Sequence, residues 1–395
     1  SPEHHEMLKH AAAECERLGL SYGVHNCDGW SSSGGPWITP EQSMKMVVWS
    51  EVQTAGGDIA IQLPQPTTRE DYYQDIAVLA YPAFKSEMDD AKNKPLITAS
   101  DANLEPLGLM NNRLDDRTVL AKQGKSLPWI QYTYPDKKTI RSVLIVCNQR
   151  DPVATLQVSD NGVDFTDVRE LYTVRTGKRE WSINDSFEPV SAKYFRITFD
   201  QTILLSTQCL HNIMGRISMG RTEDNAMTPI GEPTADMIIA KDQMINLSDK
   251  LQEDGTLKAT LPEGNWTILR FGFTSTGAFN NPATDSGRGL ECDKFNREAF
   301  KAHYDAFSKK VIENTRDIAP NAMQYIEIDS YEMGGQNWTN DYAQIFKEKY
   351  GYDITVFLPL YAGRFVESAK ASDAVLWDVR QLNCGLMTDN YFGYF

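Results

Sequence analysis

The pattern of apolar and polar residues changes twice along the 395 residues of the sequence, and this change constrains the fold more than any other feature. Between about residues 105 and 220 the apolar runs are short, rich in β-branched and aromatic residues, and separated by turns. They fall at residues 129–134, 142–147, 155–159 and 194–199. The triplet Asp160-Asn161-Gly162 is a strong hairpin signal, because Asn-Gly readily adopts the positive φ angles of a tight turn. The pattern predicts an antiparallel β-sandwich inserted into a different kind of domain.

The residues before this insertion alternate between helical and extended patterns. Residues 7–18 carry one apolar stripe at helical spacing that stops at Gly19, where a C-terminal cap belongs, and residues 20–26 predict a short strand. After a Gly/Ser-rich loop, Thr39, Pro40 and Gln42 form a capping box, which predicts the start of a second helix. Helix, strand, loop and helix together indicate one unit of an α/β architecture.

The same alternation resumes after the insertion. A strand at residues 265–272 is expected to return the chain to the first domain. The pattern then predicts a helix at residues 296–315, a strand ending at Asp329, a helix at 340–350 stopped by Gly351, a short apolar run at 354–358, and a helix from 372 to 395. Because the first helix has no capping sequence and the last has no closing element, we expect the chain to be part of a longer protein.

The run QYIEIDSYE at residues 324–332 is the strongest pointer to chemistry. It predicts a buried strand that ends in two carboxylates, Asp329 and Glu332. Barrel enzymes keep their catalytic residues at the carboxyl ends of strands. Neighbouring carboxylates raise the pKa of one of the pair, so that one acid holds a proton while the other stays ionised, as glycoside hydrolysis requires. The simpler alternative is that Asp329 caps the next turn and Glu332 is solvated.

The loop at residues 26–37 combines glycines and serines with Trp30 and Trp37. Aromatic faces stack on pyranose rings, and small residues let backbone groups approach sugar hydroxyls, so the loop suits a sugar site. A structural turn with buried tryptophans is an equal alternative. His25 and Asn26 stand at the end of the preceding predicted strand, where His25 is either catalytic or a satisfied core histidine.

Three further acids are candidates for the site. Glu291 and Asp293 lie on one side of an extended segment and could hydrogen-bond a sugar or bind a hard cation, or form a surface acidic pair. Asp378 lies beside the apolar stripe of the last helix, where a carboxylate needs a partner. An ion pair with a nearby arginine and a supporting role in the site are the two interpretations of Asp378.

Charge and composition exclude several other classes. The net charge of −15 and a pI near 4.9 argue against a nucleic-acid partner, which requires clustered lysine and arginine, and favour an uncharged or cationic ligand. No apolar run is long enough for a membrane span. The six cysteines are scattered without a CxxC pair, which disfavours structural zinc and leaves a Cys15–Cys27 disulfide as one possibility.

Six separate motifs resemble those of glycoside hydrolase family 106, the α-L-rhamnosidases. They are GVHNCDGWSSSGGPWITPEQSMK (23–45), GNWTILRFGFTSTG (264–277), GRGLECDKF (287–295), IDSYEMGGQNWT (328–339), GYD (351–353) and LWDVR (376–380). They cover nearly all of the α/β portion in the right order. The middle insertion more loosely resembles a galactose-binding-like sandwich.

The resemblance implies an (α/β)8 TIM-type barrel, incomplete in this chain, that removes terminal α-L-rhamnosyl residues from plant-type or bacterial glycans with inversion of configuration. Residues 1–104 would form its first part, residues 105–220 the inserted sandwich, and residues 221–395 the strand-rich return and the continuation of the barrel. By motif, Glu332 corresponds to the general acid, and Asp329 and Asp378 correspond to acidic positions of the site. The general base is expected beyond residue 395.

The resemblance also implies calcium as a cofactor, with no metal ligands identified, and a rhamnose-containing oligosaccharide or polysaccharide as the partner. His25, Asn26, Trp30, Trp37, Glu291, Asp293, Trp338 and Asp378 are the predicted substrate-binding residues. Because rhamnosylated glycans are usually met outside the cytoplasm, we expect a periplasmic or secreted protein. The alternative hypothesis is a non-catalytic carbohydrate-binding protein, or an inactive piece of such an enzyme.

Overall fold

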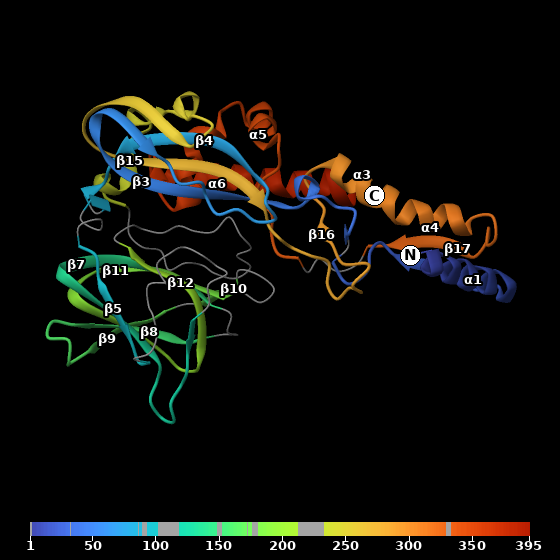
Figure 1. Ribbon diagram of the computed structural model, residues 1–395, viewed down its shortest axis with the longest axis horizontal. Helices are drawn as coiled ribbons and strands as arrows, with labels where there is room; N and C mark the ends of the chain where they lie inside the picture. The colour runs from blue at the N-terminus through green and yellow to red at the C-terminus, as the bar shows by residue number, and fades with distance from the viewer. Residues whose placement is uncertain are drawn as a thin grey trace.

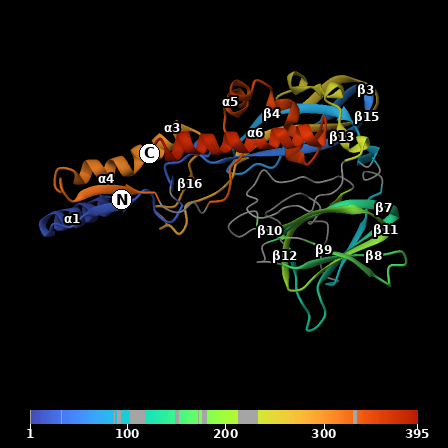
Figure 2. The same ribbon diagram turned by 180° about the vertical axis from the view of Figure 1, so that it is seen from behind.

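The computed structural model describes residues 2–31, 33–85, 87–88, 93–101, 118–147, 152–171, 173–175, 181–211, 233–328 and 333–395. It mixes helices and strands in several sheets. Along its longest axis, a group of helices with a small parallel sheet lies at one end, and a four-stranded sheet packed against further helices lies at the other (Figure 1). An eight-stranded sheet lies below the four-stranded sheet in this view and in the view from behind (Figures 1 and 2). None of the described helices is long and apolar enough to cross a membrane.

The small parallel sheet brings together two segments that lie about 300 residues apart in the sequence. Strand β1 (Tyr22–His25) pairs in parallel with β17 (Met323–Glu327). Helix α1 (Pro2–Leu18) ends at Gly19, whose φ of 69° confirms the predicted cap. The predicted helix at 296–315 is present as α3 (Arg297–Ala306) and α4 (Ser308–Thr315). Strand β17 lies beside α4 and α1 at this end of the molecule (Figure 1).

The four-stranded antiparallel sheet corrects one prediction. The capping box at Thr39 and Gln42 is formed, but it closes only the 3-10 turn η1 (Pro40–Gln42), and the predicted second helix is wrong. The chain continues as the long strand β3 (Lys45–Gln62) because Ser43 returns to an extended conformation. The sheet order is β14-β4-β15-β3, with β4 (Tyr73–Pro82), β14 (Ile245–Asn246) and β15 (Thr256–Ser275). The pairing of β15 with β3 and β4 confirms the predicted return strand.

Helices from the C-terminal part cover one face of this sheet. Helix α5 (Tyr342–Tyr350) ends at the left-handed Gly351, as predicted. Helix α6 (Ala369–Met387) buries its predicted apolar stripe, and the π-helix η7 (Thr388–Phe392) follows it. The apolar run at 354–358 begins the 3-10 helix η6 (Ile354–Ala362). Residues of α5, η6 and α6 pack with strands β3, β4 and β15 in the largest hydrophobic core among the described residues.

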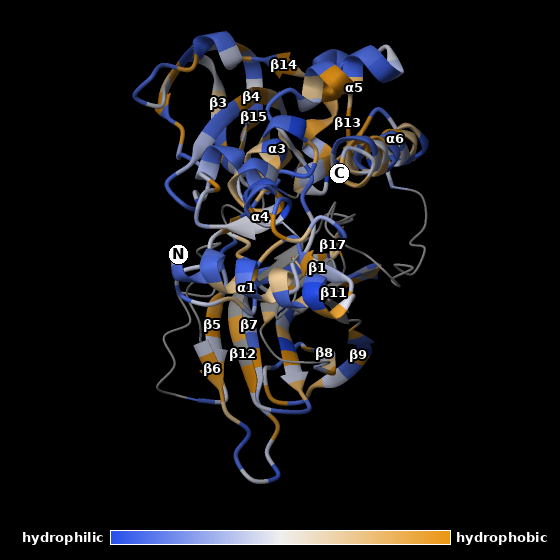
Figure 3. Ribbon diagram, turned by 90° about the vertical axis from the view of Figure 1, so that its right-hand side faces the viewer, coloured by the Kyte–Doolittle hydropathy of each residue, from blue (hydrophilic) through white to orange (hydrophobic). Residues whose placement is uncertain are grey.

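The inserted region is an antiparallel sheet with its own core. Its path is β6-β12-β7-β11-β8-β9, with β5 paired to β7 and β10 paired to β11. The strands are β5 (Leu96–Ala99), β6 (Thr118–Leu120), β7 (Trp129–Cys147), β8 (Ala154–Ser159), β9 (Thr166–Leu171), β10 (Thr173–Arg175), β11 (Trp181–Phe199) and β12 (Ile203–His211). Gly162, with a φ of 77°, forms the predicted turn between β8 and β9. Hydrophobic residues run along β5, β7 and β12 (Figure 3).

Parallel strand pairing, on which the predicted barrel depends, is sparse in the described part of the chain. Among the described residues, parallel pairing is limited to β1–β17 and to β18 (Phe365–Val366) with β13 (Ile238–Ile239), each a two-stranded sheet. These residues do not show a TIM barrel, which stays a prediction. The boundaries predicted near residues 105 and 220 lie outside the described residues.

Candidate functional site

The carboxyl ends of β1 and β17 lie side by side and define the candidate site. His25 stands opposite Glu327 in the register, and the Asn26 backbone N–H donates to the Glu327 carbonyl at 2.8 Å. The loops that follow these two strands therefore start from neighbouring points, which is where parallel α/β enzymes place their chemistry. The expectation that this strand is buried is wrong, because none of the β17 residues is buried and Tyr325 is 55% exposed. The predicted acids Asp329 and Glu332 follow β17 directly but lie outside the described residues.

His25 and Asn26 differ in their surroundings. The half-buried His25 ring places Nδ1 3.1 Å from the Cys27 carbonyl oxygen. Asn26 is fully buried, and its Oδ1 accepts a 2.5 Å hydrogen bond from the Ser308 hydroxyl. These contacts favour an anchoring role for Asn26 at the strand end. Cys15 and Cys27 form no disulfide with each other.

Trp37 belongs to a buried chain of hydrogen bonds that sequence reasoning missed. Its indole N–H donates to Nδ1 of His303 at 3.1 Å, and Nε2–H of His303 donates to the Asn26 carbonyl at 2.8 Å. His303 must therefore be neutral with its proton on Nε2. Burial lowers the pKa of His303 from 6.5 to about 4. This helical histidine ties α3 to the loop after β1, and only tertiary structure reveals it.

This arrangement predicts acid sensitivity around α3. The folded-state pKa of His303 lies below the unfolded value, so its contribution to stability is complete above about pH 6.5 and is lost as the pH falls toward 4. The shift corresponds to about 3 kcal/mol at most. Hydrogen exchange of residues 297–306 in the full-length protein should show this loss of protection, after correction for intrinsic exchange.

Two variants make this pH test specific. His303→Gln should flatten the pH dependence of protection, because no group then titrates at that position. His10→Gln, at an exposed position of α1, should leave the dependence unchanged. The explanation would be wrong if His303→Gln lost as much protection between pH 6.5 and 4.5 as the natural protein.

Asp293 is fully buried at the centre of a satisfied polar cluster. Its carboxylate pairs with the Lys45 ammonium at 3.1 Å and accepts hydrogen bonds from the Gln336 amide at 2.7 Å and the Thr339 hydroxyl at 2.6 Å. Lys45 also donates to two backbone carbonyls of residues 41 and 43. The cluster joins the start of β3 to the segment that follows β17. Asp293 thus serves as the anchor between these two segments.

Glu291 belongs to a second buried pair. One carboxylate oxygen, Oε2, is 2.7 Å from the Lys294 ammonium and accepts a hydrogen bond from the Ser33 hydroxyl at 3.2 Å. The other oxygen, Oε1, is buried against Gly34 and has no donor among the described residues. Strand β16 (Leu290–Glu291) pairs with β2 (Gly34–Gly35), which sets this contact. The surface acidic pair considered from the sequence is therefore wrong, because both carboxylates are inside.

These two acids do not fit a calcium site. Calcium binds six to eight oxygens, but each carboxylate here already holds a lysine ammonium, which would compete with the cation. The part of the chain that the structure describes contains no group of three or more His, Cys, Asp or Glu residues able to hold a metal ion. A calcium requirement stays a prediction without assigned ligands.

The loop after β1 is fastened to residues 280–289. Asp28 accepts hydrogen bonds from the backbone N–H and the hydroxyl of Thr284, at 2.8 and 2.7 Å. Asn280, only 1% exposed, donates to the carbonyls of Asp28 and Gly287, both at 2.9 Å. On this loop Trp30 is 59% exposed. The predicted aromatic loop therefore combines a rigid backbone with one accessible indole.

Trp338 and Asp378 lie in different surroundings from Trp30. Trp338 is 2% exposed in the main core, with its ring centroid 4.6 Å from that of Tyr342, so its position favours packing over sugar contact. Asp378 on α6 accepts a hydrogen bond from the Tyr352 hydroxyl at 2.8 Å. Its observed partner is thus a tyrosine, where the sequence suggested an arginine. Burial, with Asp378 as a further cause, raises the pKa of Tyr352.

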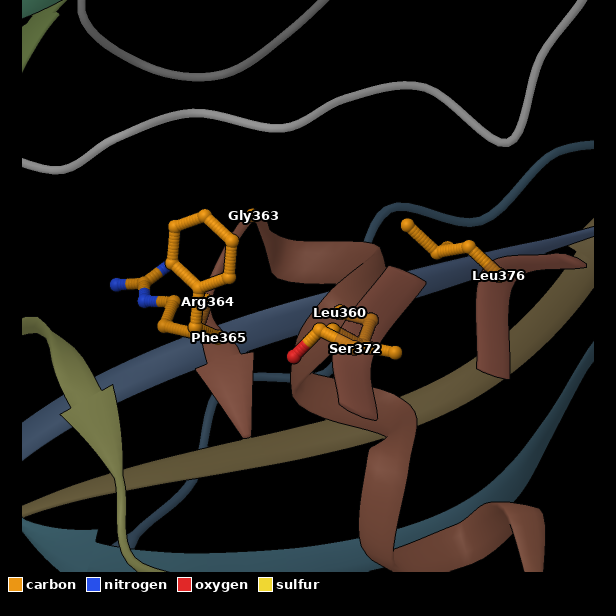
Figure 4. Close-up of a pocket in the computed structure, with 6 residues that line it drawn as sticks. All are labelled: Leu360, Gly363, Arg364, Phe365, Ser372 and Leu376. Carbon is orange, nitrogen blue, oxygen red and sulfur yellow. The ribbon is translucent and has the colours of Figure 1, made fainter. Parts of the chain in front are cut away.

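A small, mostly apolar pocket lies away from the β1–β17 end, between η6, β18 and α6 (Figure 4). Its lining residues are Leu360, Gly363, Arg364, Phe365, Ser372 and Leu376. The Arg364 guanidinium is committed to Glu51 at 2.5 Å and to Glu87 at 3.3 Å. None of the described residues that line this pocket is a carboxylate, so the pocket does not offer the acid chemistry expected of a glycosidase. The strand ends stay the candidate site.

The whole chain matches a family model described as alpha-L-rhamnosidase, over residues 1–395. The match places the protein among the glycoside hydrolases, the class that the strand-end acids predicted. The chain belongs to glycoside hydrolase family 106, as its motifs indicated.

Two similar proteins carry the names of glycosidases. The solved structure of a rhamnosidase from Novosphingobium sp. PP1Y has a TM-score of 0.79 and 26% identity, and the match covers 100% of this chain and 39% of that one. A candidate beta-glucuronidase from Formosa agariphila is 28% identical over 391 residues, which are 99% of this chain and 23% of that protein. The chain thus spans about two fifths of the first protein and less than a quarter of the second.

Proposed function

We propose that this chain is part of a glycosidase that removes terminal α-L-rhamnosyl residues from plant-type or bacterial glycans with inversion of configuration. The observation that carries the proposal is the family match over all 395 residues, supported by the similarity of the fold to a rhamnosidase. Glu332 would act as the general acid on the leaving oxygen, with Asp329 as its polar companion. A second carboxylate across the sugar ring, about 6.5 to 9.5 Å away, would activate water.

The two buried lysines of the described site are not available to bind the carboxylate of a glucuronide. A uronic acid carboxylate requires a cationic partner, and arginine or lysine supplies it most strongly. The buried ammonium groups of Lys45 and Lys294 are already paired with Asp293 and Glu291. The net charge of −15 acts in the same direction. Rhamnose carries no charge and meets no such penalty.

The test compares two substrates on the full-length protein. We expect release of the aryl group from an aryl α-L-rhamnoside and no comparable release from an aryl β-D-glucuronide. Proton NMR of the early product should show β-L-rhamnose first, because an inverting enzyme changes the anomeric configuration. Preferential cleavage of the glucuronide would overturn the substrate proposal. Calorimetric binding of a rhamnoside without any product would instead favour a non-catalytic carbohydrate-binding protein.

We also infer a periplasmic or extracellular location, because the glycans that carry rhamnose are found there. Fractionation of the native cells checks this inference directly. Recovery of the protein with cytoplasmic marker enzymes would contradict it.

A further inference from the structure

Trp30 combines high exposure with a tightly held backbone. Its indole is 59% exposed, whereas its own backbone N–H donates to the Asn281 carbonyl at 3.3 Å. The preceding Gly29 has a φ of 94°, and a Cβ there would stand 2.3 Å from the Pro282 carbonyl oxygen. Residues 29 and 30 therefore lie directly against residues 281 and 282. Exposed loop residues are usually more mobile, and this contrast calls for an explanation.

Asn280 is the centre of the attachment. Its amide N–H groups donate to the carbonyls of Asp28 and Gly287 at 2.9 Å and approach that of Gly34 at 3.4 Å. Its amide oxygen accepts from the Gly289 backbone N–H at 2.8 Å. The buried Asn280 side chain thus forms hydrogen bonds to backbone atoms through both its N–H donors and its oxygen acceptor. No other amino acid presents two donors and one acceptor in this compact geometry.

The hydrogen bonds that fix the loop on both sides of Trp30 lower the entropy cost of binding a ligand there. Asn280 contacts the carbonyls of residues 28 and 34, which bracket the tryptophan in the sequence. A tryptophan whose backbone is already fixed loses only the freedom of its two side-chain torsions when a ligand stacks on it, so binding retains more of the contact energy. The flat apolar face suits the C–H face of a neutral pyranose ring.

We propose that Trp30 is a pre-organised stacking platform for a pyranose ring of the substrate, and that Asn280 is its positioning residue. This inference rests on the proposed function and deepens it. Asn280 does not touch the sugar but acts through the loop that carries Trp30. Thr284 supports the same loop through its two hydrogen bonds to Asp28.

A double-mutant cycle in the full-length protein tests the coupling. We expect Trp30→Ala to raise KM for an aryl α-L-rhamnoside about tenfold, the equivalent of one lost stacking contact, with kcat within about twofold. Trp30→Phe should recover part of the loss. Asn280→Ala should raise KM several-fold in the natural background and hardly at all when Trp30 is already alanine, because it acts through that ring.

Matched variants keep the test decisive. Trp49→Ala removes another exposed indole, on β3, and should leave KM unchanged. If Asn280→Ala does not fold, Thr284→Val removes one of the two hydrogen bonds to Asp28 and should show the same dependence on Trp30 on a smaller scale. Equal increases in KM in both backgrounds would show that Asn280 is merely structural and would overturn the proposal.

The outcomes separate this inference from the proposed function. Turnover of the rhamnoside with an unchanged KM in Trp30→Ala would leave the function standing and reject the platform. If the protein instead cleaves the aryl glucuronide, the same cycle on that substrate tests the platform while the rhamnosidase proposal falls. If neither substrate is cleaved, calorimetry with methyl α-L-rhamnoside measures the cycle as binding, and absence of binding rejects both.

Discussion

Replacing Glu332 with glutamine in the full-length protein should lower kcat for an aryl α-L-rhamnoside by about 10²- to 10⁴-fold, the usual contribution of a general acid. The amide keeps the size of the side chain but cannot deliver a proton to the leaving oxygen. The loss should shrink as the leaving group becomes more acidic, because a dinitrophenolate departs without protonation. Initial rates on phenyl and dinitrophenyl rhamnosides, measured with the same preparation, give this comparison.

The structure supplies a control for this experiment. Glu313→Gln makes the same chemical change at an exposed position on α4 and should leave kcat within about twofold. Undiminished rhamnose release by Glu332→Gln would remove Glu332 from the mechanism. An equal loss on both leaving groups would argue that the residue binds or orients substrate instead of donating a proton.

Replacing Lys294 with methionine should destabilise the site by about 3 to 5 kcal/mol, the usual cost of removing one partner from a buried ion pair. The Lys294 and Glu291 side chains are both 0% exposed and 2.7 Å apart. Without the ammonium, Glu291 would keep a single hydrogen bond from Ser33 on Oε2, while Oε1 already has no donor among the described residues. Urea unfolding of the full-length protein and hydrogen exchange of residues 290–306 measure the loss.

A second replacement, at Glu291, shows whether the unpaired charge causes the loss of stability. Adding Glu291→Gln to Lys294→Met removes the orphaned charge and should recover much of the lost stability. Lys301→Met breaks an exposed pair with Asp305 on α3 and should change little, because water screens that pair. If the double variant were no more stable than the single one, lost packing around Lys294 would explain the effect better than charge.

Local signals explain which elements the sequence predicted correctly. Gly19 and Gly351 mark helix ends because each adopts a left-handed conformation that a glycine accommodates without strain. The apolar stripe of α6 is visible because helical periodicity extends over its 19 residues. The Asn161-Gly162 turn is likewise encoded in consecutive residues. Each of these features depends on neighbours in the sequence and on nothing distant.

The errors come from interactions between distant residues. The segment 45–62 became a strand because β15, some two hundred residues later, supplies its hydrogen-bond partners, and the short capping box could not reveal this. The sequence indicates that Glu291 and Asp293 act as a pair, but it does not indicate that Lys294 and Lys45 are their ion-pair partners. Lys45 lies at the start of an apolar run, where a lysine is expected to be buried and to need an acidic partner, so the sequence does contain a signal for this ion pair. His303 gave no such sign.

The same distinction applies to the aromatic residues. Trp30, Trp37 and Trp338 all lie in glycine-containing motifs, and sequence alone treats them as equivalent candidates for sugar stacking. In the structure Trp30 is exposed, Trp37 is half-buried on His303, and Trp338 is packed in the core. Exposure depends on which elements cover a residue. The predicted role of Glu332 in catalysis stays a prediction.

The order β14-β4-β15-β3 also dictates when the four-stranded sheet can assemble during synthesis. Strand β15 lies between β4 and β3, so these two early strands have no mutual hydrogen bonds and cannot form a hairpin of their own. Apart from the two-residue pairing of β4 with β14, both must wait until residue 275 leaves the ribosome, which takes tens of seconds at about 5 to 20 residues per second. The eight-stranded sheet is made within that interval. The nascent chain therefore carries two apolar strands unpaired while its inserted domain folds, a period in which a chaperone would protect it from aggregation.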